Sequence, residues 1–380
     1  MIRGSVLIVG GGIGGLSTAI ALQNAGYETR ILELQEGVHS SVYGVGIIQP
    51  VNALRALSMI GCLEECLAAG YASKAWGRML DVDGNEIREV PGAVIPESGL
   101  PSMNGLTRPK LHKILTDKAL EVGVVITYGA TFTELTEHAG GVDVSLSDGG
   151  TVTVDMVVGA DGVNSKVRPY VLGEDGPQPK YLGQSAFRVN IPREPEIDRI
   201  VLQHGPAGMA GFVPIGPDLA YLFYNMNWEE GRRLPQEQTA EQLRKHLAPF
   251  GGLTGRVRDK YLDDPSAIVF RPEEWLIAPA PWHRGRIVLI GDAVHAVPPH
   301  LGQGAAQAIE DGVVLAECLS DSGDLESAFS AYVGRRYDRC KLIVESCVKI
   351  GHYEMDPAGH PDFDHAGLTQ HCLETMVKPL

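Results

Sequence analysis

The sequence predicts an α/β fold organised around a parallel, Rossmann-like sheet. Three observations support this. A short apolar run, Val6–Val9, leads straight into the glycine-rich loop Gly10–Gly15. After a helical stretch comes a second strand-like run, Thr29–Leu34. Far along the chain, the continuous apolar run Ile287–Ile290 ends in Gly291-Asp292, as expected for a strand buried on both faces.

The first loop has the G-x-G-x-x-G spacing of a dinucleotide-binding turn. Glycines there let the backbone approach a pyrophosphate, and the start of the next helix offers free N–H groups. An acidic residue on the second strand is placed to accept a hydrogen bond from a ribose hydroxyl. The fingerprint does not distinguish NAD from FAD. The candidate cofactor residues are Gly10, Gly12, Gly14, Gly15 and Glu33.

The late strand is followed by a second candidate site. Asp292 comes at the carboxyl end of its strand, where open α/β sheets bind ligands. Two prolines then precede Gly302-Gln303-Gly304, which leads into a helical segment beginning near Ala305. A glycine-rich approach to a helix start presents unpaired N–H groups and the positive end of the helix dipole. This stretch therefore predicts a site for a group that becomes negatively charged.

A third strand, Met156–Ala160, also ends in an acid and a glycine, Asp161-Gly162. Between the first and third strands, Arg108 opens a helix, where it is either a phosphate contact or a surface arginine. Acid-bearing turns after two strands so far apart in sequence indicate a shared binding edge.

The pattern changes between about residues 177 and 281, where proline increases and apolar and polar residues alternate. This indicates an inserted, mostly antiparallel β-sheet domain. We expect segments 1–75, 101–176 and 282–330 to form the dinucleotide-binding domain. We expect segments 76–100 and 177–281 to form the inserted domain. The remainder, 331–380, reads as a C-terminal helical segment.

The net charge of −15 argues against nucleic acid or an anionic membrane as the main partner. No window approaches the ~20 apolar residues of a membrane helix, and no signal peptide is apparent, so we expect no integral membrane segment and a cytoplasmic location. The six cysteines lack redox or zinc spacing and read as buried free thiols. We expect no metal site. The C-terminal histidines lack regular ligand spacing, which favours solvent-facing or interface positions (His352, His360, His365 and His371).

Together, these three motifs resemble those of the class A flavoprotein monooxygenases, the single-component FAD-dependent aromatic hydroxylases. The resemblance runs from the N-terminus to about Arg339. It implies that the first glycine loop and Glu33 hold the adenosine diphosphate of FAD, assisted by Arg108. It also implies that Asp292 binds the ribityl chain, that Asp161 serves both FAD and a transient nicotinamide, and that residues Gly302, Gln303 and Gly304 stabilise the reduced flavin.

The resemblance implies a reaction as well. NADH or NADPH would reduce the flavin, O₂ would form a flavin C4a-hydroperoxide, and an electron-rich aromatic or N-heteroaromatic ring would be hydroxylated. Hydroxybenzoate-, hydroxypyridine- and urate-like substrates all fit. His300, after Pro299, is a candidate base or substrate anchor, with a loop-capping role as the alternative. Candidate substrate contacts in the inserted sheet are Arg188, Tyr221 and Tyr224.

The chain also departs from the family pattern. An arginine common in the family near the second glycine turn is replaced by His39, Ser40, Ser41 and Tyr43. Another flavin oxidoreductase, such as a reductase or halogenase, is the alternative enzyme, although the halogenase signature G-W-x-W-x-I-P is absent. A non-enzymatic partner-binding relative is a further alternative. The sequence does not set the oligomeric state, and a homodimer is one arrangement it allows.

Overall fold

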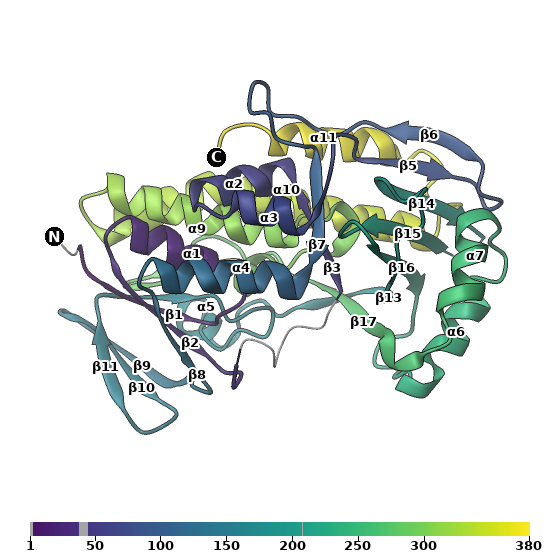
Figure 1. Cartoon of the computed structure of the whole chain (residues 1–380). Helices are drawn as coiled ribbons and strands as arrows, with labels where there is room; N and C mark the ends of the chain where they lie inside the picture. Colours follow the sequence, from purple (N-terminus) through teal and green to yellow (C-terminus); the bar gives the residue numbers. More distant parts are fainter. Residues whose placement is uncertain (1–2, 38–44, 207) are drawn as a thin grey trace.

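The computed structural model describes residues 3–37, 45–206 and 208–380. The departures expected at His39, Ser40, Ser41 and Tyr43 lie outside this part of the chain. Two large sheets lie side by side along the molecule, and long helices run over the first sheet and continue toward the second (Figure 1). The mixed α/β class expected from the sequence is confirmed.

The first large sheet has six strands in the order β18-β19-β12-β1-β2-β8. All neighbouring pairs are parallel except β18–β19. Its apolar strands lie in the largest hydrophobic core, which explains the continuous apolar runs. The strands are β1 (Ser5–Val9), β2 (Glu28–Glu33), β8 (Val125–Tyr128), β12 (Met156–Gly159), β18 (His283–Arg284) and β19 (Ile287–Leu289).

Helices cover one face of this sheet, and a small antiparallel sheet lies on the other (Figure 1). Helix α1 packs on both α9 and α4, which places three helix starts close to the loops that leave the strands. The helices on this face are α1 (Ile13–Asn24), α4 (Arg108–Glu121), α8 (Asp292–His295) and α9 (Gly304–Asp321); α5 (Arg168–Leu172) instead lies against the small sheet, with the Tyr170 ring 5.9 Å from that of Phe132. The small sheet consists of β9 (Phe132–His138), β10 (Gly141–Leu146) and β11 (Thr151–Val154).

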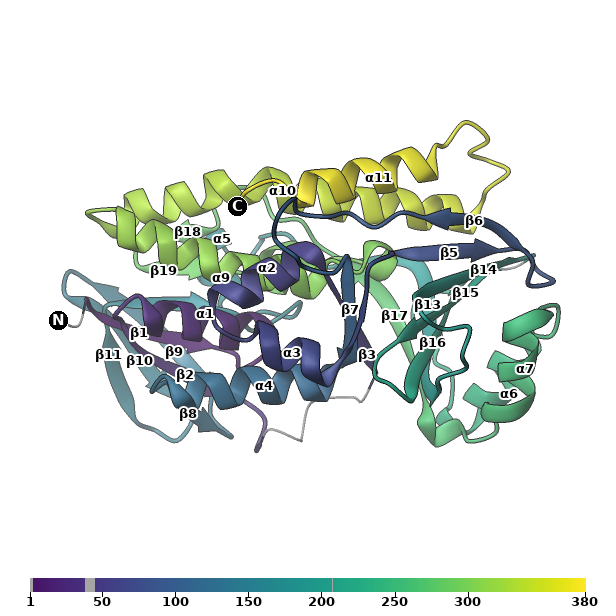
Figure 2. The same cartoon turned by 45° about the horizontal axis from the view of Figure 1, so that its top comes forward.

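The second large sheet has seven strands in the order β17-β13-β16-β15-β14-β5-β6. Its pairs are antiparallel except β14–β5. Helices α6 (Thr239–His246) and α7 (Gly252–Tyr261) cover its outer face (Figure 2). The strands are β5 (Gly77–Leu80), β6 (Glu86–Val90), β13 (Lys180–Pro192), β14 (Ile200–Gly205), β15 (Gly208–Pro214), β16 (Leu219–Asn227) and β17 (Ile268–Trp275).

The two large sheets are joined by a fourth sheet, again of three strands, and by the C-terminal helices. The small sheet has the order β3-β7-β4 and contains β3 (Gly46–Pro50), β4 (Tyr71–Ser73) and β7 (Met103–Thr107). Beside it lie α2 (Val51–Met59) and α3 (Leu63–Ala69). Helix α10 (Leu325–Met355) packs on α9 and also contacts β13, and α11 (His365–Met376) packs back on α10 (Figure 2).

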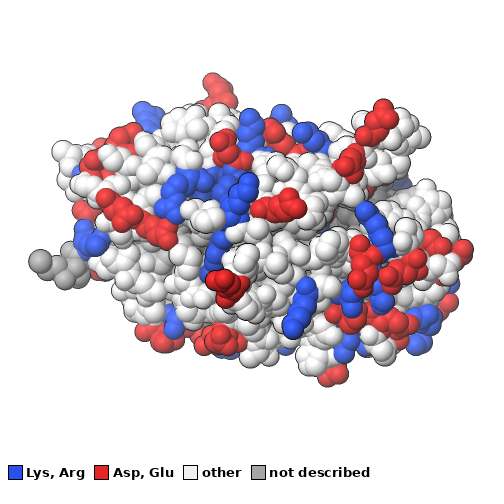
Figure 3. Space-filling model, turned by 90° about the horizontal axis from the view of Figure 1, so that it is seen from above, with Lys and Arg blue, Asp and Glu red and all other residues white. Residues whose placement is uncertain are grey.

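Two elements were not predicted from the sequence, namely β14 and α7, while α11 lies within the predicted C-terminal helical segment. The histidine- and aspartate-rich sequence before α11 hides a short helix whose Asp364 cap accepts from the Gly367 N–H. All six cysteines are buried and free, as expected. Among the described residues, no helix is long and apolar enough to cross a membrane. On the face seen in Figure 3, acidic and basic side chains are interspersed, with one group of basic side chains near its centre.

Candidate functional site

Two cavities meet where the large sheets adjoin. The first, here called the glycine cleft, has a volume of about 500 Å³ and runs past the ends of β1, β12 and β19, from Gly12 to Gly304. The second, here called the inner cavity, measures about 370 Å³ and lies between the seven-stranded sheet and the C-terminal helices. The cavities adjoin, because they share the lining residues Ile48, Arg188, Tyr221, Pro299 and Gly302.

The first glycine loop is fixed by very close backbone packing. A Cβ on Gly10 would lie 2.4 Å from the carbonyl oxygen of Ala160, and a Cβ on Gly15 would lie 1.9 Å from the carbonyl oxygen of Gly10. No side chain fits at either position. These two glycines therefore let the loop fold tightly against the turn after β12.

The other glycines of the loop face the cleft. Gly12 and Gly14 line it, and a Cβ on Gly12 would meet nothing within 4 Å. Gly12 is also the N-cap of α1 and makes no side-chain cap, so the helix start is open toward the cleft. Glu33 stands beside the loop, accepting from the Gly11 N–H at 2.7 Å. This cradle has the shape and dipole that suit a pyrophosphate.

Asp161 does something different from what the sequence suggested. Its carboxylate accepts hydrogen bonds from the Ser165 hydroxyl and from the N–H groups of Lys166 and Val167. The neighbouring Gly162 lines the glycine cleft, whereas Asp161 does not. The structure thus argues against the expected direct cofactor contact, because Asp161 is used to shape the loop that forms the cleft wall.

Arg108 and Asp292 lie far apart in the sequence, and both line the glycine cleft. Arg108 begins α4, and its backbone N–H is anchored by the carbonyl of Val45 at 2.9 Å. The side chain of Asp292 is exposed to the cleft, yet the cleft walls withdraw it from bulk water and raise its pKa, an effect opposed by His295 and Arg108. The cleft therefore offers a cation and a hydrogen-bonding carboxylate.

A buried ion network holds the turn after β19. Asp311 accepts from the Gly291 N–H at 2.8 Å, pairs with His295 Nε2 at 2.6 Å, and binds Arg336 Nε at 2.7 Å. Although burial alone would raise the pKa of Asp311, His295 and Arg336 lower it to about 2. His295 thus holds the loop in place. None of these three side chains is exposed.

The same network contains a group with metal-ligand chemistry. The side chains of His295, Asp311 and Cys340 each bring one donor atom within 4.8 Å of the others. The guanidinium of Arg336 is bonded to Asp311 and lies 3.5 Å from Cys340 Sγ. A second cation at this point would meet that positive charge, so the donor set fits an ion-pair network better than a metal ion.

The start of α9 borders both cavities. Gly302 has a left-handed φ of 61° that ends a short 3₁₀ turn, Pro299–Leu301, and Gly304 begins the helix. Gln303 is the N-cap but makes no side-chain cap; its side chain turns inward and hydrogen-bonds Asn52. The structure therefore argues against a cofactor contact by the Gln303 side chain. It leaves the helix N–H groups beside Gly304 facing the cleft.

His300 lines the inner cavity in a buried hydrogen-bonded group. Its Nε2 lies 2.9 Å from Gln184 Oε1 and 3.4 Å from Glu354 Oε2. Burial alone would lower the pKa of His300, but the Glu354 carboxylate outweighs it and the pKa is raised. The other ring nitrogen, Nδ1, is buried and has no hydrogen-bond partner among the described residues. That nitrogen is the one left for a ligand.

The three expected substrate contacts do not share one face of the sheet. Arg188 and Tyr221 line both cavities, while Tyr224 is fully buried on the opposite face, stacked on His246. Because side chains alternate along β16, residues 221 and 224 cannot point the same way. The expectation for Tyr224 is therefore corrected. Arg188 is paired with Glu273 at 2.8 Å.

Sequence reasoning missed much of the inner cavity. Glu354 comes from the end of α10 and His365 from the start of α11, and both line the cavity. The expectation that His365 faces solvent or an interface is thus wrong.

A parallel sheet with a glycine cleft, and a second sheet lining a cavity beside it, fit an enzyme that binds a dinucleotide. A family model described as an FAD binding domain matches residues 3–345. The aurachin C monooxygenase/isomerase of Stigmatella aurantiaca is 33% identical over 354 residues, 91% of this chain and 88% of that protein. The 6-hydroxynicotinate 3-monooxygenase of Pseudomonas fluorescens is 30% identical over 355 residues, 89% of each chain.

Solved structures agree on the fold. HpxO of Klebsiella pneumoniae, solved with FAD and uric acid, superposes with a TM-score of 0.83 at 21% identity, covering 99% of this chain and 93% of that one. The chain belongs to the class A flavoprotein monooxygenases. It is an FAD-dependent monooxygenase. The residues of the glycine cleft fit that cofactor, since they combine a glycine cradle, a cation and two helix starts.

Proposed function

We propose that this enzyme uses NADH or NADPH and O₂ to hydroxylate an electron-rich aromatic or N-heteroaromatic small molecule. Hydroxybenzoate-, hydroxypyridine- and urate-like rings are the candidates. The observation that carries the proposal is a cavity that adjoins the glycine cleft and holds His300, whose buried Nδ1 has no hydrogen-bond partner among the described residues. Two relatives support it, because one is a 6-hydroxynicotinate 3-monooxygenase and another was solved with uric acid.

We assign the adenosine diphosphate part of FAD to the end of the glycine cleft at Gly12, and the flavin ring to the end at Gly304. The loop at Gly12 and Gly14 would hold the pyrophosphate, with Glu33 beside the adenosine ribose and Arg108 near the phosphates. Asp292 would accept from ribityl hydroxyls. The start of α9, at Gly304, would stabilise negative charge on the reduced ring.

Bound FAD supplies the activation of O₂ after reduction by the nicotinamide. The protein's own residues would position the substrate ring, exclude water and accept a proton from the substrate. Segments 76–100 and 177–281 would form the substrate domain, whose sheet closes the inner cavity, while 1–75, 101–176 and 282–330 would form the FAD domain. The sheet over the cavity would limit side reactions with water. Pro299 lines both cavities and would lie between the substrate ring and FAD.

We assign proton exchange with the substrate to His300. An electron-rich ring reacts faster when its hydroxyl or N–H proton is removed, and His300 Nδ1 is free to take that proton while Nε2 stays bonded to Gln184 and Glu354. After hydroxylation the proton would return to solvent or product. Because Glu354 raises the pKa of His300, the neutral, proton-accepting form is populated only at higher pH than for a free histidine.

The test is a screen of hydroxylated benzoates and N-heteroaromatics with purified FAD-loaded enzyme. A substrate should stimulate NADH or NADPH consumption and yield hydroxylated product in equal amount. Consumption that yields only hydrogen peroxide for every ring, or reduction of the ring, would favour a different flavin oxidoreductase. A chlorinated product in the presence of chloride would favour a halogenase. We also propose a cytoplasmic location, which the six buried free thiols support.

A further inference from the structure

We propose that the substrate is an uncharged ring system with an apolar substituent, bound with its polar edge against Asn225 and His300 and its substituent against Trp76, Met79 and Leu202. This rests on the proposed function, which it narrows. It disfavours the small ring carboxylates among the candidates above. Four features of the inner cavity carry the inference.

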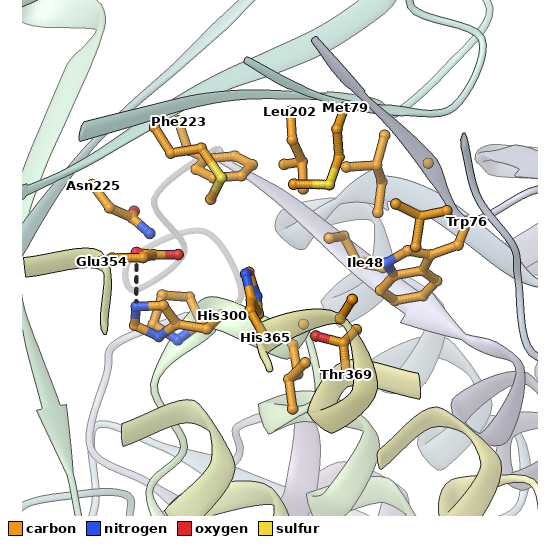
Figure 4. A pocket seen from close by; sticks show the side chains of 18 of the residues that line it. Ile48, Trp76, Met79, Leu202, Phe223, Asn225, His300, Glu354, His365 and Thr369 are labelled. Carbon is orange, nitrogen blue, oxygen red and sulfur yellow. Dashed lines mark ion pairs between the residues drawn. The ribbon is translucent and has the colours of Figure 1, made fainter. Parts of the chain in front are cut away.

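The first feature is the cavity's uneven polarity. Figure 4 shows Asn225, Glu354 and His300 together on one side of the cavity. On the other side most labelled side chains are apolar (Ile48, Trp76, Met79 and Leu202), while His365 and Thr369 line the wall between the two groups. A ligand that fills both sides must therefore be polar at one end and apolar at the other.

The second feature is a pair of unsatisfied polar atoms on the polar side. Asn225 Oδ1 and His300 Nδ1 are both buried and have no hydrogen-bond partner among the described residues. Leaving such atoms unpaired destabilises the empty cavity, and a ligand that pairs them recovers that cost. Asn225 Oδ1 can only accept, so the ligand must offer an N–H or O–H there. A hydroxylated or N–H-bearing ring edge supplies that donor and a second group for His300.

The third feature is charge. The cationic groups deep in the cavity are already matched by acids, Arg188 by Glu273 at 2.8 Å and His300 by Glu354 at 3.4 Å. His365, also in the wall, has a lowered pKa because of burial. Arg88 lines the cavity from an exposed position, and the neighbouring Glu89 is paired with Arg199 at 2.7 Å. A substrate carboxylate would therefore lose its hydration without meeting an unmatched buried cation among the described residues.

The fourth feature is size. An apolar cavity of about 150 Å³ holds one benzene ring. The inner cavity measures about 370 Å³, more than twice that volume. A single hydroxylated ring would leave the Trp76 side empty, and an empty apolar wall forgoes its contacts. A ring with a chain or second ring fills it.

The experiment is a ligand series titrated into FAD-loaded enzyme without NAD(P)H, with the visible spectrum of bound FAD as the signal. Two scaffolds are used: 4-alkylphenols and 2-alkyl-4-hydroxypyridines, each with ethyl, butyl and hexyl chains. Their charged counterparts are 4-hydroxybenzoate and 4-hydroxypyridine-2-carboxylate. We expect Kd to fall about two- to fourfold per added methylene. We also expect each carboxylate to bind more weakly than the matching ethyl compound.

A Kd that is flat with chain length on both scaffolds, or carboxylates that bind most tightly, would overturn the inference. In Leu202→Gln the dependence on chain length should shrink. The same change at Leu120, an exposed position on α4, is the control and should leave it intact. Asn225→Leu should weaken every ligand equally and keep the slope. Turnover is not needed, so a failure of hydroxylation with an intact chain-length effect would count against the proposed function alone.

Discussion

The glycine cleft and the inner cavity adjoin, yet they are built in opposite ways. The cleft is formed largely by backbone, from loops whose glycines allow approaches that no Cβ permits, as at Gly10 and Gly15. The inner cavity is formed by side chains from β5, β14, β16, α10 and α11. In the cleft, backbone conformation shapes the site and a few side chains such as Arg108 and Asp292 add to it; in the cavity, the site is made of side chains throughout.

This difference separates what each region can control. A change in the cleft should act on FAD content, since its glycines and helix starts recognise a cofactor common to the family. A change in the inner cavity should act on the fate of the oxygen and the choice of ring, while FAD stays bound. Each of the following predictions would strengthen or break that separation.

The largest effect is expected from His300→Ala. Removing the group assigned to proton exchange should lower coupled hydroxylation about a hundredfold or more at neutral pH, with FAD content unchanged. Product formed per NAD(P)H consumed and the flavin-to-protein ratio are the two measurements. His352→Ala, at an exposed position on α10, is the matched control. Equal loss of hydroxylation and FAD would remove His300 from the chemistry.

Gly15→Ala should do the reverse. Its Cβ would lie 1.9 Å from the Gly10 carbonyl oxygen, a backbone atom that cannot move aside cheaply. We expect most of the FAD to be lost and stability to fall by about 1–3 kcal/mol, as for other overpacked sites. Gly334→Ala, exposed in α10 with nothing within 4 Å of its Cβ, should instead be neutral or slightly stabilising. A Gly15→Ala protein that still binds one FAD per chain would contradict the account of the loop.

Asp292→Ala should weaken FAD binding about tenfold, the cost of one hydrogen bond to a charged group. The Kd for FAD, measured by quenching of its fluorescence on binding to the apoprotein, is the test. Asp338→Ala on the exposed side of α10 provides the control. An unchanged Kd would show that Asp292 faces the cleft without contacting the cofactor.

The smallest effect is expected from Glu354→Gln, as a shift in the pH dependence of kcat/KM. Burial lowers the pKa of His300 and Glu354 raises it above its ordinary value, so removing the carboxylate should lower it. Neutral His300 would then appear at lower pH. The acidic limb of the kcat/KM profile should therefore move to lower pH. Glu345→Gln, exposed on the same helix, should leave the profile in place. A profile unmoved by Glu354→Gln would show that His300 does not govern that limb.

The sequence predicted the glycine cleft well because its determinants are local. The strand, loop and helix around Gly12 occupy one continuous segment, and Asp292 follows its strand directly. The inner cavity depends on long-range contacts that periodicity cannot reveal. Glu354 reaches His300 only because α10 extends to the second sheet. Alternation shows that Arg188 and Phe187 lie on opposite faces of the sheet, but only the packing shows which face lines the cavity. The sequence therefore could not separate Arg188, which lines it, from Tyr224, which does not.

The most direct test of the central idea is an isotope experiment with ¹⁸O₂ on a turnover-competent ring. If FAD in the glycine cleft delivers oxygen to a substrate in the inner cavity, the product should carry one ¹⁸O atom for each NAD(P)H consumed. His300→Ala should release the oxygen as hydrogen peroxide while FAD remains bound. Product oxygen derived from water, or labelling that persists unchanged in His300→Ala, would contradict the account.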